Sequence, residues 1–291
     1  MPNARTKLFG VIGDPVGHSL SPVLHNYFLK KYKLNAFYFA FRVVPANLEA
    51  CVRGAWAMGL AGLNVTLPHK EKVVELVKFR SPEVNLLGVA NTLSMREEGV
   101  AAFVTDPAGF MASVQPMQTH FRESRVVLFG AGGSARSVAY ALSKMGTREL
   151  TIVNRTYDRA LQLSRFCTEQ LGFRKVSVLG MRDPGLNDHI LGAQALVNAT
   201  SIGMSPYVDY TPLYDFSAVS QNHFVYDLVY NPVWTVFLRE AKKKGAKVQN
   251  GLDMLIYQGL ESLQIWMNET YSIARNELNA LRIQLSTELQ T

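Results

Sequence analysis

The stretch Arg125–Arg136, with the sequence RVVLFGAGGSAR, decides the fold. Its first five residues form a short apolar run typical of a buried strand, and helical spacing continues after the glycines to about Lys144. The turn between them matches the G-x-G-x-x-A form of the dinucleotide-binding fingerprint. Gly130 permits the tight turn, Gly132 lets a pyrophosphate approach the backbone, and Ala135 permits close helix–strand packing. The predicted binding residues of this turn are Gly130, Ala131, Gly132, Gly133, Ser134 and Ala135.

The strand that follows this helix indicates which dinucleotide is bound. NAD-binding domains usually carry an acidic residue at the end of this strand, where it bonds the ribose diol. Here the predicted strand Glu149–Val153 is followed by Asn154, Arg155 and Thr156, and Arg159 lies one helical turn further on. Two guanidinium groups and a hydroxyl suit a 2′-phosphate. The sequence therefore predicts NADP, the alternative being that both arginines are ordinary surface residues.

A second informative stretch, Gly62–Lys70, reads GLNVTLPHK. It predicts a short buried strand that ends at Pro68 and leads into a helix with Lys70 near its start. Asn64 and Thr66 are two residues apart and therefore point to the same face of the strand, with Leu67 on the apolar face. Ligands usually bind at strand ends in α/β sheets, so we expect an amide, a hydroxyl and an ammonium group there. The alternative is a buried amide that caps a turn and a solvated lysine.

Two hydroxyls and one carboxylate stand ahead of predicted helices. Ser19 and Ser21 precede a helix that begins near Pro22, and such a pair suits a polyol carboxylate because a helix N-terminus favours anions. Ser21 is alternatively only the N-cap of that helix. Asp106 ends the strand Val100–Val104 and precedes Pro107, so it lies near another helix start and is alternatively a simple N-cap.

The remaining pattern predicts an α/β architecture. Strands and helices alternate from Lys7 to Lys70, which favours a domain with at least partly parallel strands. A hairpin turn is expected at residues 97–99, and three phenylalanines are expected on one face of the strand Asn35–Val43. The C-terminal segment Ser272–Leu289 carries leucines at helical spacing, for which core packing is expected and a dimer contact is the alternative.

Composition limits the function classes. The 291 residues are 48% hydrophobic, and no apolar run approaches the ~20 residues that span a bilayer. The only cysteines, Cys51 and Cys167, lack metal-ligand spacing, so we expect a reduced cytoplasmic protein without a metal site. The net charge of +7 is scattered, which suits an anionic small molecule and does not indicate nucleic acid. The protein is expected to be a monomer or a homodimer.

Taken together, the motifs resemble those of the shikimate dehydrogenase family, which includes the quinate/shikimate dehydrogenases. The resemblance covers roughly Lys7–Trp266, and the motifs follow the family's order. They are His18–Pro22 with His25 and Asn26, Asn64–Lys70, Gly88–Thr92, Asn198–Met204, and Asn250–Gly259. The loop Ala199–Pro206 also resembles one that lies near a nicotinamide ring.

This resemblance implies a discontinuous α/β substrate domain, residues 1–105 and 253–291, and a Rossmann NADP-binding domain, residues 106–252, with the active site in the cleft between them. The implied activity is that of an oxidoreductase of aromatic amino acid biosynthesis, the NADPH-dependent reversible reduction of 3-dehydroshikimate to shikimate. Lys70 and Asp106 are the implied catalytic pair, at the C3 oxygen. The implied substrate-binding residues are Ser19, Ser21, Asn64, Thr66, Lys70, Asn91, Asp106, Tyr230 and Gln258. Implied cofactor-binding residues beyond those above are Thr200, Val229 and Gly251.

One segment departs from the family pattern. The family usually reads Asn-Thr-Asp-Gly around the catalytic aspartate, whereas this chain reads Val104-Thr105-Asp106-Pro107. Pro107 fixes φ and lacks an N–H, and the preceding asparagine is lost as a hydrogen-bonding group. Two alternatives therefore stay open: a quinate or aminoshikimate dehydrogenase of the same family, and a catalytically silent sensor of shikimate-pathway metabolites.

Overall fold

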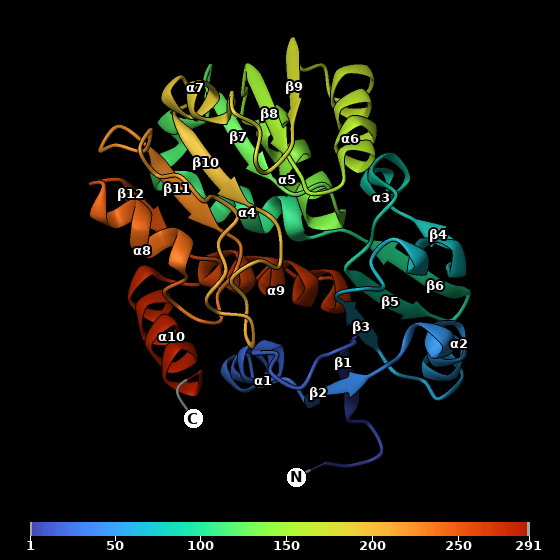
Figure 1. Ribbon diagram of the computed structural model, residues 1–291. Coiled ribbons are helices and arrows are strands. Elements are labelled where there is room, and N and C mark those ends of the chain that lie inside the picture. The colour runs from blue at the N-terminus through green and yellow to red at the C-terminus, as the bar shows by residue number, and fades with distance from the viewer. Residues whose placement is uncertain (1, 290–291) are drawn as a thin grey trace. The chain divides into compact units, whose positions relative to one another are not determined.

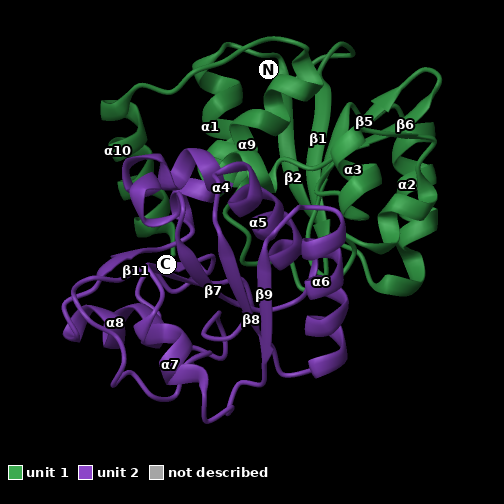
Figure 2. Cartoon of the chain, turned by 90° about the horizontal axis from the view of Figure 1, so that it is seen from above, with its two compact units in different colours: residues 1–109, 255–291 green, residues 110–254 purple. Residues whose placement is uncertain are grey.

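The chain divides into two compact units, each built around one six-stranded sheet. The computed structural model describes residues 2–289. Unit 1 comprises residues 1–109 and 255–291, and unit 2 comprises residues 110–254 (Figure 2). The chain passes between the units within helix α4 (Asp106–Val114) and helix α9 (Leu252–Met267). The division therefore falls inside two helices and not in loops.

Unit 1 contains a mixed sheet in the order β2-β1-β3-β5-β6-β4 (Figure 1). Strand β1 pairs in parallel with β2 and β3, whereas β3–β5 and β5–β6 are antiparallel. The expected partly parallel sheet and the hairpin at residues 97–99 are thus confirmed. The elements are β1 (Lys7–Gly13), α1 (Ser21–Lys31), β2 (Ala36–Arg42), η1 (Pro45–Asn47), α2 (Leu48–Ala57), β3 (Gly62–Val65), η2 (Lys72–Leu76), β4 (Phe79–Arg80), α3 (Pro82–Leu87), β5 (Thr92–Arg96), β6 (Gly99–Phe103) and α10 (Arg275–Glu288).

Helix α9 packs on the sheet of unit 1 through a close approach at Gly62. A Cβ atom at Gly62 would overlap the indole ring of Trp266, so only glycine fits this point of β3. The same indole stacks on Phe9 with ring centroids 4.7 Å apart and donates a hydrogen bond to the Leu93 carbonyl. Alternation along β2 places Tyr38 in this core and leaves the phenylalanine face exposed.

The segment after β3 differs from the prediction. Lys70 lies in a turn, and the next helical element is the 3₁₀ helix η2, which begins only at Lys72. The Lys70 carbonyl accepts a hydrogen bond from the Ala90 N–H at 2.9 Å, so it is not available for a helical ladder. Leu67, expected on the apolar face of the strand, is 55% exposed because β3 ends at Val65.

Unit 2 contains a parallel sheet in the order β12-β11-β10-β7-β8-β9 (Figure 1). The chain builds outward from β7 in one direction and then returns to its other side at β10, which is the doubly wound arrangement. The predicted Rossmann fold is confirmed. The elements are η3 (Gln115–His120), β7 (Arg125–Phe129), α5 (Gly133–Lys144), β8 (Glu149–Val153), α6 (Tyr157–Glu169), β9 (Lys175–Leu179), α7 (Leu186–Leu191), β10 (Ala195–Asn198), β11 (Phe224–Asp227), α8 (Val236–Lys243) and β12 (Lys247–Gln249).

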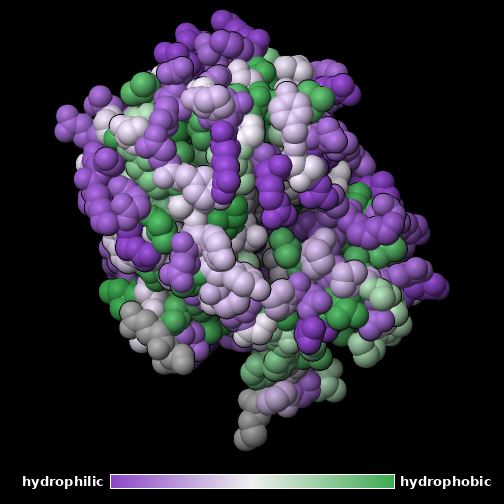
Figure 3. Space-filling model, in the orientation of Figure 1, coloured by the Kyte–Doolittle hydropathy of each residue, from purple (hydrophilic) through white to green (hydrophobic). Residues whose placement is uncertain are grey.

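The displayed surface mixes hydrophilic and hydrophobic residues (Figure 3). No helix in residues 2–289 combines the length and the apolarity that crossing a bilayer requires.

Helix α10 docks through its leucine stripe, as expected for core packing. Leu278, Leu281 and Leu285 are buried, whereas Ile283 on the opposite face is 69% exposed. The Glu277 carboxylate accepts hydrogen bonds from the Ala274 N–H at the helix start and from Lys31 on α1. The helix is therefore part of unit 1's own core.

We expect the Leu281→Ala substitution to lower the free energy of unfolding by about 2–5 kcal/mol, because it opens a cavity where no side-chain surface is exposed. Urea unfolding followed by circular dichroism measures this change. Ile283→Ala is the matched control and is expected to change the value by less than about 0.5 kcal/mol. Equal effects of the two substitutions would contradict the packing described for α10.

Candidate active site

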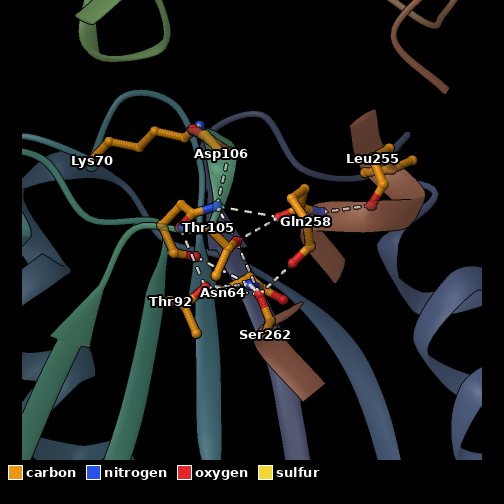
Figure 4. A network of polar contacts seen from close by, with 9 residues as sticks. Asn64, Lys70, Thr92, Thr105, Asp106, Leu255, Gln258 and Ser262 are labelled. Atoms are coloured by element: carbon orange, nitrogen blue, oxygen red, sulfur yellow. Dashed lines mark hydrogen bonds and ion pairs between the residues drawn. The ribbon is translucent and has the colours of Figure 1, made fainter. Parts of the chain in front are cut away.

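A cluster of buried polar side chains lies on the sheet of unit 1 (Figure 4). Asn91 is the hub of its hydrogen bonds. The Asn91 amide nitrogen is 2.9 Å from the Thr105 hydroxyl, 2.8 Å from Asp106 Oδ1 and 3.2 Å from Gln258 Oε1. Its carbonyl oxygen accepts the Thr105 N–H at 2.7 Å. Asn91 precedes β5 and Thr105 follows β6, so the hairpin brings the two residues together.

Asn64 forms a second hub, deeper in the same cluster. Its carbonyl oxygen accepts the Tyr38 hydroxyl at 2.7 Å, and its amide nitrogen reaches the Asn91 carbonyl, the Thr92 hydroxyl and the Ser262 hydroxyl at 3.0–3.2 Å. The amide is thus fully engaged within the protein. A buried amide costs least when all of its groups are paired, and one of these hydrogen bonds holds the backbone carbonyl of Asn91.

Lys70 and Asp106 form a largely buried ion pair at the edge of the cluster. The Lys70 Nζ atom lies 2.5 Å from Asp106 Oδ2, and the two side chains are 19% and 6% exposed. The other carboxylate oxygen accepts the Asn91 amide, so Asp106 is held at both oxygens. Its place in the first turn of α4 adds a favourable interaction with the helix dipole. The Lys70 ammonium keeps N–H groups that can donate hydrogen bonds to a ligand oxygen.

The turn that carries Lys70 is fixed by its neighbour. The buried imidazole of His69 lies 2.6 Å from the Val43 carbonyl, and the His69 N–H bonds to the Thr66 carbonyl. Together with the bond from Ala90 to the Lys70 carbonyl, these contacts hold the backbone on both sides of the lysine.

Pro107 is compatible with this geometry. The first α4 hydrogen bond runs from the Gly109 N–H to the Thr105 carbonyl, so an N–H at position 107 would have no partner within the helix. Val104, where the family has asparagine, packs against the apolar core of unit 1. The departure at Val104 and Pro107 therefore leaves Asp106 in contact with both Asn91 and Lys70.

The alternative interpretation of Ser21 as the N-cap of its helix is wrong, and the substrate-binding role of the two serines stays a prediction. Ser21 is the first residue of α1 and its side chain does not cap the helix, whereas the Ser19 hydroxyl accepts the Ser21 N–H at 3.2 Å. Ser19 rather than Ser21 therefore satisfies the helix start. In the described part of the chain, neither serine nor Thr66 is hydrogen-bonded to the cluster, which leaves the hydroxyls of Ser21 and Thr66 available.

Several members of the cluster were missed in the sequence. Ser262 lies one helical turn after Gln258 on α9, and this spacing could have indicated that both face the sheet. Thr92 and Thr105 adjoin predicted residues, and Tyr38 occupies the buried face of β2. Of the predicted substrate-binding residues, all belong to unit 1 except Tyr230, which belongs to unit 2.

Next to Tyr38 of this cluster, the imidazole of His25 is buried and uncharged. Its ring stacks on Tyr38 with centroids 4.2 Å apart, and neither ring nitrogen has a hydrogen-bond partner within residues 2–289. Burial lowers the pKa of His25 to about 3, and the nearby Asn64 side chain offsets only part of that effect.

In unit 2, the glycine turn has the geometry that the fingerprint requires. Gly130 has a φ of +111°, and a Cβ there would press on Ala199 and Thr200. A Cβ at Gly132 would meet no atom within 4 Å, so the N-terminus of α5 is open to a ligand. Ala135 is fully buried against the sheet. The residues present therefore fit a dinucleotide pyrophosphate.

The predicted phosphate-binding arginines lie at the next strand end. Arg155 and Arg159 are exposed around the start of α6, and the Asn154 amide bonds to the Thr156 carbonyl, which shapes the turn. An exposed carboxylate, Asp158, also lies in this first helical turn.

Two further strand ends carry the other predicted cofactor residues. The Thr200 hydroxyl bonds to Asn198 at 2.7 Å, and the Val229 N–H bonds to Asp227 at 3.0 Å. Val229 is buried, and its carbonyl accepts a hydrogen bond from the Gly251 N–H at 3.3 Å. Gly251 is required by packing, because a Cβ there would overlap the Leu228 carbonyl.

A Rossmann sheet with an open glycine turn and a separate α/β unit with an ammonium–carboxylate pair define a two-domain, dinucleotide-dependent oxidoreductase. Comparison with known proteins specifies the family. Residues 11–93 match the family model for the shikimate dehydrogenase substrate binding domain, and residues 113–201 match that for shikimate / quinate 5-dehydrogenase. The chain belongs to the shikimate dehydrogenase family.

Individual relatives agree over nearly the full length. The shikimate dehydrogenase (NADP(+)) of Methanopyrus kandleri is 40% identical over 92% of each chain. A crystal structure of a shikimate dehydrogenase in complex with NADP⁺ superposes with a TM-score of 0.90 at 35% identity, covering 100% of this chain and 98% of the other. The Thermus thermophilus enzyme, in complex with NADP(H) and shikimate, gives 0.81 at 31% identity over 98% of each chain.

The burial of His25 leads to a prediction for how the free energy of unfolding depends on pH. Between pH 6.5 and about 3 the unfolded chain binds a proton at this residue and the folded protein does not, so stability falls as the pH falls below 6.5. The slope from one such group approaches ~1.4 kcal/mol per pH unit. We expect His25→Phe to remove this part of the slope in urea unfolding between pH 4.5 and 7.5. His18→Asn, at an exposed histidine, should leave the slope unchanged; a wild-type slope in His25→Phe would contradict the prediction.

Proposed function

We propose that this protein is a shikimate dehydrogenase, which catalyses the NADPH-dependent, reversible reduction of 3-dehydroshikimate to shikimate. The observation that carries this proposal is the Lys70–Asp106 pair, joined at 2.5 Å and anchored by Asn91 in a buried polar cluster. Membership of the family supports the same activity and places it in aromatic amino acid biosynthesis.

The chemistry assigned to the pair follows from charge. NADPH, when bound, supplies the hydride. Reduction of a ketone places negative charge on its oxygen, and an ammonium group beside that oxygen stabilises the charge and can transfer the proton. We assign this role to Lys70 at the C3 oxygen. Asp106 would orient the Lys70 ammonium group, and would accept a hydrogen bond from a substrate hydroxyl.

The remaining substrate contacts are assigned to groups around this pair. The hydroxyls of Ser19, Ser21 and Thr66 would bind the carboxylate and ring hydroxyls. Asn64, Asn91 and Gln258 would contact or support the ring, since they already form one connected network. Tyr230 is assigned to the substrate as well. The ring is thereby fixed by hydrogen bonds, for which a polyol offers matching groups.

The cofactor is assigned to unit 2. The turn from Gly130 to Ala135 would hold the pyrophosphate at the N-terminus of α5. Arg155, Thr156 and Arg159 would bind the 2′-phosphate, with Asn154 shaping their turn. The backbone groups near Thr200, Val229 and Gly251 would line the rest of the dinucleotide. Both cysteines are free thiols, which suits the reducing cytoplasm in which we place the enzyme.

The first test measures reduction of NADP⁺ at 340 nm in separate assays with shikimate, with quinate and with aminoshikimate. Turnover chiefly with shikimate is expected. Turnover chiefly with another substrate would move the protein to a sister specificity, and shikimate binding without turnover would make it a metabolite sensor.

Lys70→Ala is expected to lower kcat by about 10²–10⁴-fold, because the developing alkoxide loses its cation and its proton donor. NADPH binding, measured by fluorescence titration, should stay near the wild-type value. The matched control is Lys72→Ala, two residues away on η2, where the exposed Lys72 side chain pairs with Glu75. Wild-type turnover in Lys70→Ala would remove this lysine from the mechanism.

Arg155→Ala is expected to raise the KM for NADP⁺ about tenfold to a hundredfold, because a charge-assisted contact to the 2′-phosphate is lost. The KM for NAD⁺, which lacks that phosphate, should hardly change. Arg165→Ala removes an exposed arginine elsewhere on α6 and serves as the control. If the substitution raised the KM for NADP⁺ and the KM for NAD⁺ by the same factor, Arg155 would not be the group that selects NADP.

A further inference from the structure

Asp227, the last residue of β11, is a fully buried carboxylate to which the proposed mechanism assigns no role. An isolated carboxylate in such a place is costly unless it is well hydrogen-bonded. Three donors surround this one. The Asn198 amide lies 2.8 Å and the Val229 N–H 3.0 Å from Oδ1, and the Thr235 hydroxyl lies 2.6 Å from Oδ2.

These three donors belong to different segments. Asn198 ends β10 and orders the next loop through the N–H and hydroxyl of Thr200. Val229 begins the loop after β11, and Thr235 caps α8 at the far end of that loop by accepting the Leu238 N–H. The Asp227 carboxylate thus links the loop after β10 to the loop after β11 through hydrogen bonds.

The loop after β10 lies beside the glycine turn, and the loop after β11 follows the neighbouring strand. Asn198 pairs with Phe129 on one side and with Asp227 on the other, so the carboxyl ends of β7, β10 and β11 form one edge. Gly130 follows Phe129 directly, and a Cβ on it would lie 3.1 Å from Ala199. The order of the sheet reverses between β7 and β10, which is where a doubly wound sheet binds its ligand.

The charge state of this carboxylate alters the contacts. Burial raises the pKa of Asp227 to about 7, against the opposing effect of its three hydrogen bonds. When protonated, Oδ2 must donate its proton, and the Thr235 hydroxyl then loses the acceptor for its own hydrogen. The neighbouring residue Tyr226 has its pKa raised by burial, and the charges of Asp253 and Asp227 raise it further. On α8, Arg239 is directed to the Trp234 carbonyl.

We propose that Asp227 is a positioning residue whose ionised form fixes the loops after β10 and β11 for cofactor binding, so that affinity for NADP(H) falls when this carboxylate is protonated. This inference rests on the proposed function for the identity of the ligand. It assigns Asp227 no contact with the reacting atoms.

The test compares Asp227→Asn with wild type in fluorescence titrations of NADPH from pH 5.5 to 8.5. The asparagine keeps the shape and the Oδ1 acceptor but resembles the protonated acid. The ratio of the two Kd values should be near 1 at low pH and rise to about fivefold to tenfold at high pH, with a midpoint near 7. Titration of the cofactor's own phosphates cancels in this ratio. At saturating cofactor, kcat should change less than about twofold, since Lys70 and Asp106 are intact.

Asp215→Asn is the matched control, because Asp215 also accepts three hydrogen bonds but is exposed. The ratio of its Kd for NADPH to that of wild type should not change between pH 5.5 and 8.5. A flat ratio for Asp227→Asn, or the same change in Asp215→Asn, would overturn the proposal.

Thr235 provides a second test if Asp227→Asn does not fold. Thr235→Ser keeps the hydroxyl and should retain the wild-type pH profile of NADPH binding. Thr235→Val removes a hydrogen-bond donor that stabilises the ionised Asp227 carboxylate. The midpoint of the pH profile of NADPH binding should therefore move to higher pH. An unmoved midpoint would also overturn the proposal. Wild type that binds NADPH in this pH-dependent way but does not oxidise shikimate would refute the proposed function alone.

Discussion

The hydrogen bonds of the Asn91 amide are the constraint on which unit 1 depends. They join the end of the β5–β6 hairpin to the start of α4 and to α9. Because the cluster is buried, each donor has to find an acceptor within it, and a half-satisfied network would cost more than an apolar core. The same requirement that stabilises the sheet therefore sets the direction of the Asp106 carboxylate, and through it the position of the Lys70 ammonium.

Much of the fold could be predicted because local patterns and tertiary packing agree. The glycine turn, the strands β7 and β8, and helix α5 have their predicted bounds, since apolar runs and turn residues mark them clearly. Elements without a strong pattern were missed. Strand β9 is a half-buried edge strand, and α7 has only six residues. Helix α3 was also missed, although Ser81 before Pro82 and Gly88 at its end are ordinary cap signals.

The candidate site was predictable as a set of residue types, but its connections were not. Strand-end and helix-start positions indicated Lys70 and Asp106, and the resemblance added Asn91 and Gln258; the structure joins all four in one network. No spacing rule could indicate that Asn64 supports Asn91, because they are neighbours only through sheet pairing. The turn at Lys70 was misread as a helix start because the decisive bond comes from Ala90, which is distant in sequence. Asp227 was passed over because buried carboxylates cannot be recognised before their donors are placed.

The passage of the chain through α4 and α9 has a consequence for how this enzyme can be altered. Asp106 and Gln258 stand in the parts of these helices that belong to unit 1, and every predicted cofactor residue stands in unit 2. Apart from Tyr230, the residues proposed to bind the substrate and those proposed to bind the dinucleotide are therefore encoded in separate stretches of sequence. A chimaera joined near residues 110 and 254 would exchange the whole nucleotide module and leave the polar cluster intact, provided that both junctions continue a helix in register.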